Sequence, residues 1–195
     1  MSESLVMLDT CTVSEGTKAR PKLGFSEWMN DHPNVAIPFP VWTELAHGIS
    51  LLTENPIKKA QLQIWLDRLR ASEYVLPELN MEVAVIYGEM MACRPLQHFW
   101  MTVPSKKKVH VKSDLLIAAI AIAHDLPLAT YDLEDFGKID SYFKMPGLIY
   151  PGCRAAELGR STSAVSSAST SDWRTRADAV TGETTNLTLA GPTFR

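Results

Sequence analysis

The sequence predicts an α/β fold in which helices flank a mostly parallel central sheet. Short apolar runs alternate along the chain with longer segments in which apolar residues recur at helical spacing. Acidic residues follow some of these runs, as expected where parallel strands end at one edge of a sheet. The length of 195 residues suits one domain with a tail, and 46% hydrophobic against 21% charged residues is ordinary for a globular protein.

The first part of the chain is expected to supply two strands and a short helix. Residues 5–8 form an apolar run that predicts a buried strand, and Asp9 follows at its carboxyl end. Apolar residues at helical spacing predict a short helix over residues 24–30, which the segment 31–34 breaks. Residues 35–37 predict a second strand.

Two helices are expected next. Because Pro38 and Pro40 delay the first, Thr43 is predicted to cap a helix that runs from Glu44 to about residue 52. Pro56 suits the first turn of the second helix. The apolar stripe of this second helix is predicted to lie in the core, and it consists of Leu62, Trp65, Leu66 and Leu69.

The second half of the chain is expected to add two more strands and two helices. Residues 74–76 and 126–130 are apolar runs that predict strands, and Asp132 follows the second run closely. Ser113 is expected to cap an apolar helix over residues 114–124. A further helix is predicted over residues 80–92, with these apolar residues on or near one face: Met81, Ala84, Val85 and Met91.

The composition changes after about residue 150. Ser, Thr, Ala and Gly make up 25 of the last 45 residues, without periodicity and with few large apolar side chains. Residues 1–150 are therefore predicted to form the domain, and residues 151–195 a disordered tail.

Cysteine usage and hydropathy indicate a cytoplasmic protein. Three scattered cysteines, Cys11, Cys93 and Cys153, are too few for a disulfide framework or a cysteine-rich zinc site. The acidic start of the chain does not resemble a signal peptide, and no apolar run approaches the ~18–20 residues that span a bilayer.

One stretch of this mildly acidic chain is basic. The formal net charge is -3, yet residues 90–113 contain no Asp or Glu. Most of its basic residues lie just before Asp114 in an irregular segment, where they are candidates for contacts with RNA phosphates, the alternative being a solvated loop. The basic residues are Arg94, Lys106, Lys107, Lys108 and Lys112.

Four acids are expected at the same edge of the sheet. Asp9 and Asp132 follow predicted strands, while Glu44 and Asp114 open predicted helices. A cluster of carboxylates is stabilised by Mg²⁺ or Mn²⁺, and such ions can activate water for attack on phosphorus. The pattern predicts phosphodiester hydrolysis, although each acid taken singly could instead cap a helix or lie on the surface.

Several short blocks follow one another in order over roughly residues 5–148. The blocks are Leu8-Asp9-Thr10-Cys11-Thr12-Val13-Ser14-Glu15, Trp42-Thr43-Glu44-Leu45-Ala46-His47-Gly48-Ile49, Val75-Leu76-Pro77, Tyr87-Gly88, Arg94-Pro95, Ser113-Asp114-Leu115-Leu116-Ile117-Ala118-Ala119 and Thr130-Tyr131-Asp132-Leu133-Glu134-Asp135-Phe136. In their order and spacing these blocks resemble a PIN-domain protein of the VapC toxin type.

The resemblance implies a PIN-like three-layer sandwich and a Mg²⁺- or Mn²⁺-dependent endoribonuclease. Such a protein is the toxin of a toxin–antitoxin pair, is usually a homodimer, and is inhibited by a cognate antitoxin. Carried over by position, the acidic quartet is Asp9, Glu44, Asp114 and Asp132. Thr10 matches a small hydroxyl residue beside the first acid, and Asp135 is a second choice for the last acid.

The chain also departs from the family pattern. Cys11 stands where the family often has Asn, so a hydrogen bond that orients the first carboxylate is expected to be missing. An Arg common shortly after the Glu is absent, and the segment 96–112 is longer than usual.

Two alternative functions remain open from the residues. The first is a PIN-like module that binds RNA or an antitoxin without cutting, which an intact quartet disfavours. The second is a haloacid-dehalogenase-type phosphatase, which needs an Asp where Cys11 stands and is therefore the weaker alternative.

Overall fold

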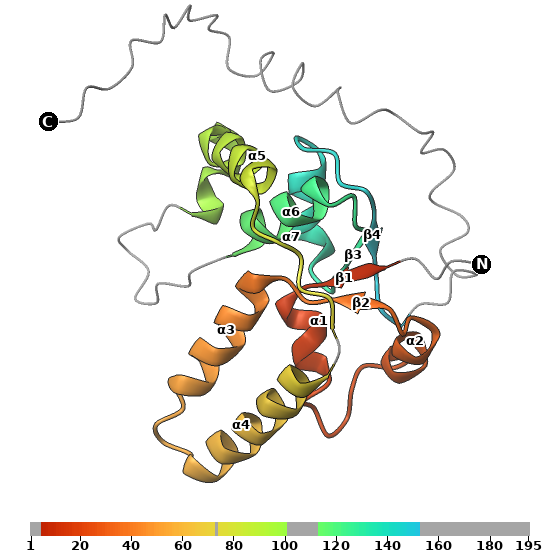
Figure 1. The fold of residues 1–195 in the computed structure, drawn as a ribbon, viewed down its shortest axis with the longest axis vertical. Helices are drawn as coiled ribbons and strands as arrows, with labels where there is room; N and C mark the ends of the chain where they lie inside the picture. Colours follow the sequence, from red (N-terminus) through yellow and green to blue (C-terminus); the bar gives the residue numbers. More distant parts are fainter. Residues whose placement is uncertain (1–4, 73, 101–112, 153–195) are drawn as a thin grey trace, which may run out of the picture.

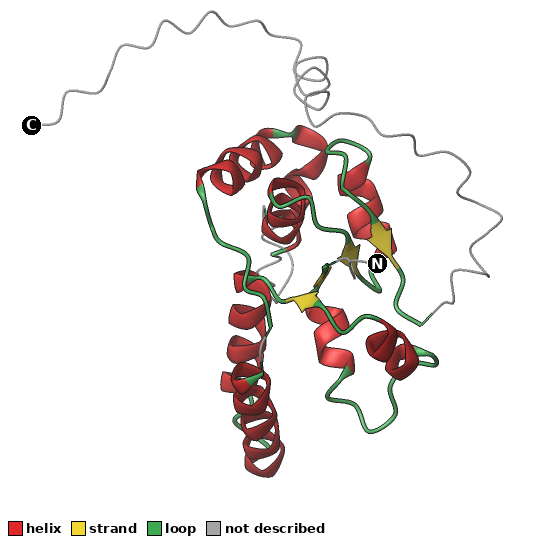
Figure 2. Cartoon of the chain, turned by 45° about the vertical axis from the view of Figure 1, so that its right-hand side comes forward, coloured by secondary structure: helices red, strands yellow, loops and turns green. Residues whose placement is uncertain are grey.

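A parallel sheet of four short strands lies at the centre of the structure, and helices lie on both sides of it (Figures 1 and 2). The computed structural model describes residues 5–72, 74–100 and 113–152. The strands are β1 (Val6–Leu8), β2 (Val35–Ala36), β3 (Leu128–Ala129) and β4 (Leu148–Ile149), in the order β2-β1-β3-β4. All three strand pairs are parallel, which confirms the predicted fold class.

Seven α-helices and one 3-10 helix are present in the described residues. In Figure 1, α5, α6 and α7 lie above the strands, and α1, α3 and α4 lie below them. The bounds are α1 (Thr10–Glu15), α2 (Phe25–Asp31), α3 (Phe39–Ser50), α4 (Pro56–Ala71), α5 (Met81–Ala92), η1 (Arg94–Phe99), α6 (Asp114–Ala123) and α7 (Leu133–Asp140). In the described parts of the chain, no helix combines the length and the apolar character that crossing a membrane requires.

The core forms where β1 and β3 meet α6. Met7 in β1 and Leu128 in β3 are fully buried, and α6 is buried over most of its surface. This burial explains why α6 is apolar on nearly every face, because a helix enclosed on all sides needs no polar stripe. The core therefore fixes the carboxyl end of β1 and the start of α6, where Asp9 and Asp114 lie.

Helix α3 begins earlier than the sequence predicted. It starts at Phe39 with Pro40 in its first turn, so Glu44 lies inside the helix and does not open it. Thr43 is not its cap, because the Thr43 hydroxyl donates to the carbonyl of Pro40 at 2.7 Å. The physical reason is that proline lacks the N–H that a first helical turn leaves unpaired, so Pro40 starts the helix instead of delaying it.

The buried face of α5 also differs from the prediction. Helix α5 buries Val83, Ile86 and Met90, whereas Met81 and Val85 are 78% and 41% exposed. Apolar residues occur all round this helix, so their spacing did not select a single face. Packing against α6 made the selection.

The remaining predictions hold in part. Residues 74–76 form only an isolated parallel bridge, in which Val75 pairs with Ala36 at the edge of the sheet. In the apolar stripe of α4, Leu66 is buried and the other three residues are partly buried. The predicted helix at 24–30 is α2, and the irregular segment contains η1, while residues 101–112 lie outside the described residues. Helices α1 and α7 and strand β4 were not predicted.

Candidate active site

Asp9 is held at the carboxyl end of β1 by three donors. Its Oδ1 accepts a hydrogen bond from the backbone N–H of Thr12 at 2.8 Å, which makes Asp9 the N-cap of α1. Its Oδ2 accepts from the hydroxyl of Thr130 at 2.6 Å and from the thiol of Cys11 at 2.8 Å. Only 4% of Asp9 is exposed, so this carboxylate has little freedom to turn.

Thr130 connects the first acid to the last. While its hydroxyl donates to Asp9, the same oxygen accepts from the backbone N–H of Asp132 at 2.9 Å. The Asp132 carboxylate caps α7 by accepting from the backbone N–H of Asp135 at 3.1 Å. Asp132 is therefore a helix cap and also lies beside Asp9. The sequence had offered a helix cap and a place in the acidic cluster as alternatives.

Three carboxylates line one pocket of about 210 Å³. They belong to Asp9, to Asp132 and to Asp114, the first residue of α6. Among the described residues, the lining contains no Lys or Arg. The full lining is Asp9, Thr10, Cys11, Ser14, Asp114, Ile117, Asp132 and Phe136.

Glu44 does not line the pocket but holds two elements that do. Its Oε2 accepts a short hydrogen bond from the hydroxyl of Thr10. Its Oε1 accepts from the backbone N–H of Ser113 at 3.2 Å. Ser113 occupies the N-cap position of α6 without a capping hydrogen bond from its own side chain, contrary to the prediction. Glu44 therefore joins α3 to the starts of α1 and α6.

Cys11 supplies the hydrogen bond that its position was expected to lack. Burial, together with the adjacent Asp9 carboxylate, raises the pKa of the Cys11 thiol to about 12. The sulfur therefore keeps its proton at neutral pH and donates it to Asp9. It also accepts from the backbone N–H of Tyr131 at 3.3 Å, so the expectation of a missing hydrogen bond was wrong.

The donor chemistry of the pocket fits a hard divalent cation. Carboxylate and hydroxyl oxygens line it together, and Mg²⁺ and Mn²⁺ prefer oxygen ligands. In the described parts of the chain, however, no group of three or more His, Cys, Asp or Glu side chains already forms a ligand set that could hold a metal ion. The pocket thus offers suitable ligands without a complete coordination shell.

The structure brings together some of the predicted site residues and not others. Asp9, Thr10, Asp114 and Asp132 line the pocket, whereas Glu44 and Asp135 do not. The predicted RNA contacts at Lys106, Lys107, Lys108 and Lys112 lie outside the described residues. Thr130 was missed as a site residue, although a hydroxyl at a strand end two residues before an acid is a signal that could have found it.

Comparison with known proteins identifies a family and several similar folds. A profile of the PIN domain matches residues 6–141. Among solved structures, FitAcB from Neisseria gonorrhoeae is 22% identical, with a TM-score of 0.53 over 75% of this chain and 97% of that chain. VapBC-1 from nontypeable Haemophilus influenzae is 22% identical, with a TM-score of 0.51 over 70% of this chain and 93% of that chain.

A third solved structure is similar in fold. VapBC-5 from Mycobacterium tuberculosis, a member of the VapBC family of toxin-antitoxin systems, is 20% identical, with a TM-score of 0.50 over 75% of this chain and 98% of that chain. At these identities the likeness establishes the fold. No curated protein matches the sequence.

Proposed function

Because the chain belongs to the PIN domain family, we propose that it is a Mg²⁺- or Mn²⁺-dependent endoribonuclease and the toxin of a toxin–antitoxin pair. The observation that carries the proposal is the convergence of Asp9, Asp114 and Asp132 on one pocket. Carboxylates gathered in one place repel each other, and a bound divalent cation relieves that repulsion.

In this proposal, Asp9, Asp114 and Asp132 hold the metal ion. When bound, the ion would supply an activated water and steady the negative charge that develops on the phosphate oxygens. Thr130, Cys11 and the backbone of Thr12 hold Asp9 in one orientation. Glu44 fixes Thr10 and the start of α6, which positions Asp114.

Metal-dependent cleavage by the purified protein tests the proposal. Incubation with a labelled single-stranded RNA and Mg²⁺ or Mn²⁺ should release fragments, and excess chelator should stop their release. Asp114→Asn should abolish cleavage while the fold remains, because a neutral amide is a poor ligand for a hard cation. Asp67→Asn, which neutralises an exposed acid on α4, is the matched control and should cleave as the wild type does.

A folded protein that binds RNA but cuts none with either metal would reject the nuclease proposal in favour of a binding module. Hydrolysis of small phosphomonoesters with intact RNA would instead indicate a phosphatase.

An antitoxin partner and a homodimer belong to the same proposal. The antitoxin is supported by the fold shared with VapBC-5, a member of the VapBC family of toxin-antitoxin systems, whereas the homodimer follows from the resemblance to the VapC type alone. Where a gene for a small DNA-binding protein lies directly upstream, co-expression with it should yield a complex that no longer cleaves RNA. Light scattering on the protein alone should give twice the mass of one chain, and a monomer would reject the homodimer.

A further inference from the structure

The loop between α1 and α2, whose course can be followed in Figure 1, carries a concentration of positive charge. Residues 16–23, named the basic loop here, contain Lys18, Arg20 and Lys22 and no Asp or Glu. All of these residues are exposed. In a chain with a net charge of -3, such a run needs a physical reason.

The basic loop begins at the wall of the pocket. The backbone N–H of Thr17 donates to the carbonyl of Ser14 at 3.1 Å, and the Thr17 hydroxyl donates to the same oxygen at 2.7 Å. Ser14 itself lines the pocket. The first residues of the basic loop therefore lie within two residues of the lining.

A buried acid fixes the conformation of the basic loop. Glu15 is 1% exposed, and its Oε2 lies 2.6 Å from the Lys18 ammonium, while its Oε1 accepts from the backbone N–H of Lys22 at 2.7 Å. The hydrogen bond from Lys18 lowers the pKa of Glu15, so the carboxylate stays charged. A buried carboxylate is tolerated only when it is paired, and here the pairing ties both ends of a five-residue segment, Lys18 to Lys22, to one side chain.

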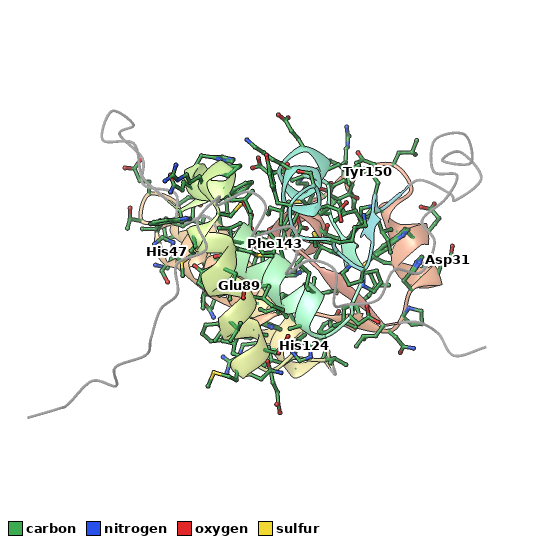
Figure 3. All side chains as sticks on the ribbon, turned by 90° about the horizontal axis from the view of Figure 1, so that it is seen from above. Asp31, His47, Glu89, His124, Phe143 and Tyr150 are labelled. Carbon is green, nitrogen blue, oxygen red and sulfur yellow. The ribbon has the colours of Figure 1, made fainter. Side chains whose placement is uncertain are left out.

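Lys22 lies over the ring of the residue that directly precedes Asp132. Its ammonium lies 3.6 Å from the centroid of the Tyr131 ring, a cation–π arrangement. Asp132 lines the pocket, and Tyr150, labelled in Figure 3, packs edge-on against the Tyr131 ring with centroids 5.1 Å apart. The charge of Lys22 is thus held by a supported ring that is one residue from a lining acid.

The far end of the basic loop is fixed by a close backbone approach. Gly24 and Gly152 have φ values of 79° and 101°, and a Cβ on Gly24 would lie 2.4 Å from the carbonyl oxygen of Gly152. Neither position tolerates a side chain. These contacts hold Lys18 and Lys22 in a defined arrangement, with Arg20 on the short segment between them.

We propose that Arg20 and Lys22 of the basic loop bind backbone phosphates of the RNA that enters the pocket. This inference rests on the proposed function. Within the described residues, neither side chain forms an ion pair, and Glu15 is ion-paired with Lys18 alone among the three cations. Pre-ordered cations beside a carboxylate-lined pocket would hold the RNA backbone while the scissile phosphate meets the acids, and they would act on any base sequence.

Binding of a fluorescein-labelled polyuridine strand, measured by anisotropy in chelator to prevent cutting, tests the inference. The variant carrying Arg20→Ala and Lys22→Ala should bind about 25-fold more weakly at ~0.1 M salt, with a slope of log K against log salt that is shallower by about 1.4. The charge-preserving variant with Arg20→Lys and Lys22→Arg should keep both affinity and slope.

The matched control carries Lys58→Ala and Arg68→Ala, which remove one lysine and one arginine charge from the exposed surface of α4. It should bind as the wild type does, whereas an equal loss in control and loop variants would show a general charge effect and overturn the inference. Unchanged binding in the loop variant would also overturn it. Loop-dependent binding without metal-dependent cutting would reject the nuclease proposal alone.

Discussion

At the scale of single residues, the site depends on hydrogen bonds to one carboxylate. The Asp9 carboxylate accepts hydrogen bonds from a thiol and a backbone amide of α1 and from a hydroxyl just after β3. These donors hold the Asp9 carboxylate in one orientation, which a metal site requires. Thr12 and Thr130 are both buried, but only the Thr130 hydroxyl bonds the Asp9 carboxylate. Comparing variants at the two positions therefore distinguishes a loss of Asp9 orientation from a loss of stability.

Replacement of Thr130 by Val should impair both stability and cleavage. The change keeps the shape of the side chain but removes the donor to Asp9 and the acceptor for the Asp132 amide. We expect a loss of about 1–3 kcal/mol in the free energy of unfolding, from urea titration. The matched control is Thr12→Val, which loses a buried hydroxyl bonded to the Ala129 carbonyl at 3.0 Å.

The control should lose similar stability and retain its rate of cleavage at saturating RNA. Equal rates in Thr130→Val and Thr12→Val would remove Thr130 from the positioning of Asp9.

The lowered pKa of Glu15 predicts a pH dependence of stability. Its folded-state pKa lies below the ordinary value of 4.5, so the stabilisation is present above that value and is lost as the pH falls through the folded-state pKa. Glu15→Gln should therefore flatten the acid side of the stability profile. Urea unfolding of both proteins from neutral to acidic pH measures this effect, and parallel profiles would contradict it.

At the scale of elements, Glu44 is the joint between α3 and the two helices that begin at the pocket. The sequence identified the residue but not this role, because the apolar periodicity of a segment does not reveal which distant hydroxyl or amide its polar side chain will meet. The contacts to Thr10 and Ser113 span 34 and 69 positions in the chain. The early start of α3, with Pro40 in its first turn, places Glu44 deep enough in the helix to make them.

Glu44→Gln tests whether Glu44 is a positioning residue or a metal ligand. The amide can keep both contacts, donating to the Thr10 hydroxyl and accepting from the Ser113 N–H. A positioning role predicts a loss of only about tenfold in the rate of cleavage. A loss as complete as that of Asp114→Asn would show instead that Glu44 binds the metal.

The sequence predicted an element correctly where it is buried on nearly every side, and less well where only one of several apolar faces is buried. The apolar run before Asp9 and the almost wholly apolar α6 could be assigned because nearly all of their residues are buried or partly buried. The face of α5 could not be assigned, since Met81 and Val83 are both apolar and only the contact with α6 distinguishes them. Strands of two residues, such as β4, leave almost no periodic signal.

At the scale of the whole molecule, the last described residues pack against the segment that precedes α2. Pro151 is buried, and Gly152 contacts the backbone of Leu23 and Gly24. Strand β4, just before them, completes the sheet and accepts a hydrogen bond from the N–H of Thr130 through the Ile149 carbonyl at 2.9 Å. The predicted boundary near residue 150 can therefore be tested by truncation on either side of β4.

A chain that ends after Gly152 should fold and cleave RNA as the full chain does. We expect its melting temperature to lie within about 2 °C of the full-length value, because residues 153–195 have too few large apolar side chains to bury a core. A chain that ends after Gly147 lacks β4 and should melt at a clearly lower temperature. If the longer truncation also unfolds or loses activity, the tail belongs to the domain.

The hydrogen bond between Thr130 and Asp9 has a consequence for biosynthesis, because it joins residues 121 positions apart. Translation delivers Thr130 well after Asp9. Until then β1 lacks its neighbour β3, and the acids have no common pocket. Under the proposed function, the protein would therefore stay inactive on the ribosome and leave its own messenger intact until β3 has been synthesised.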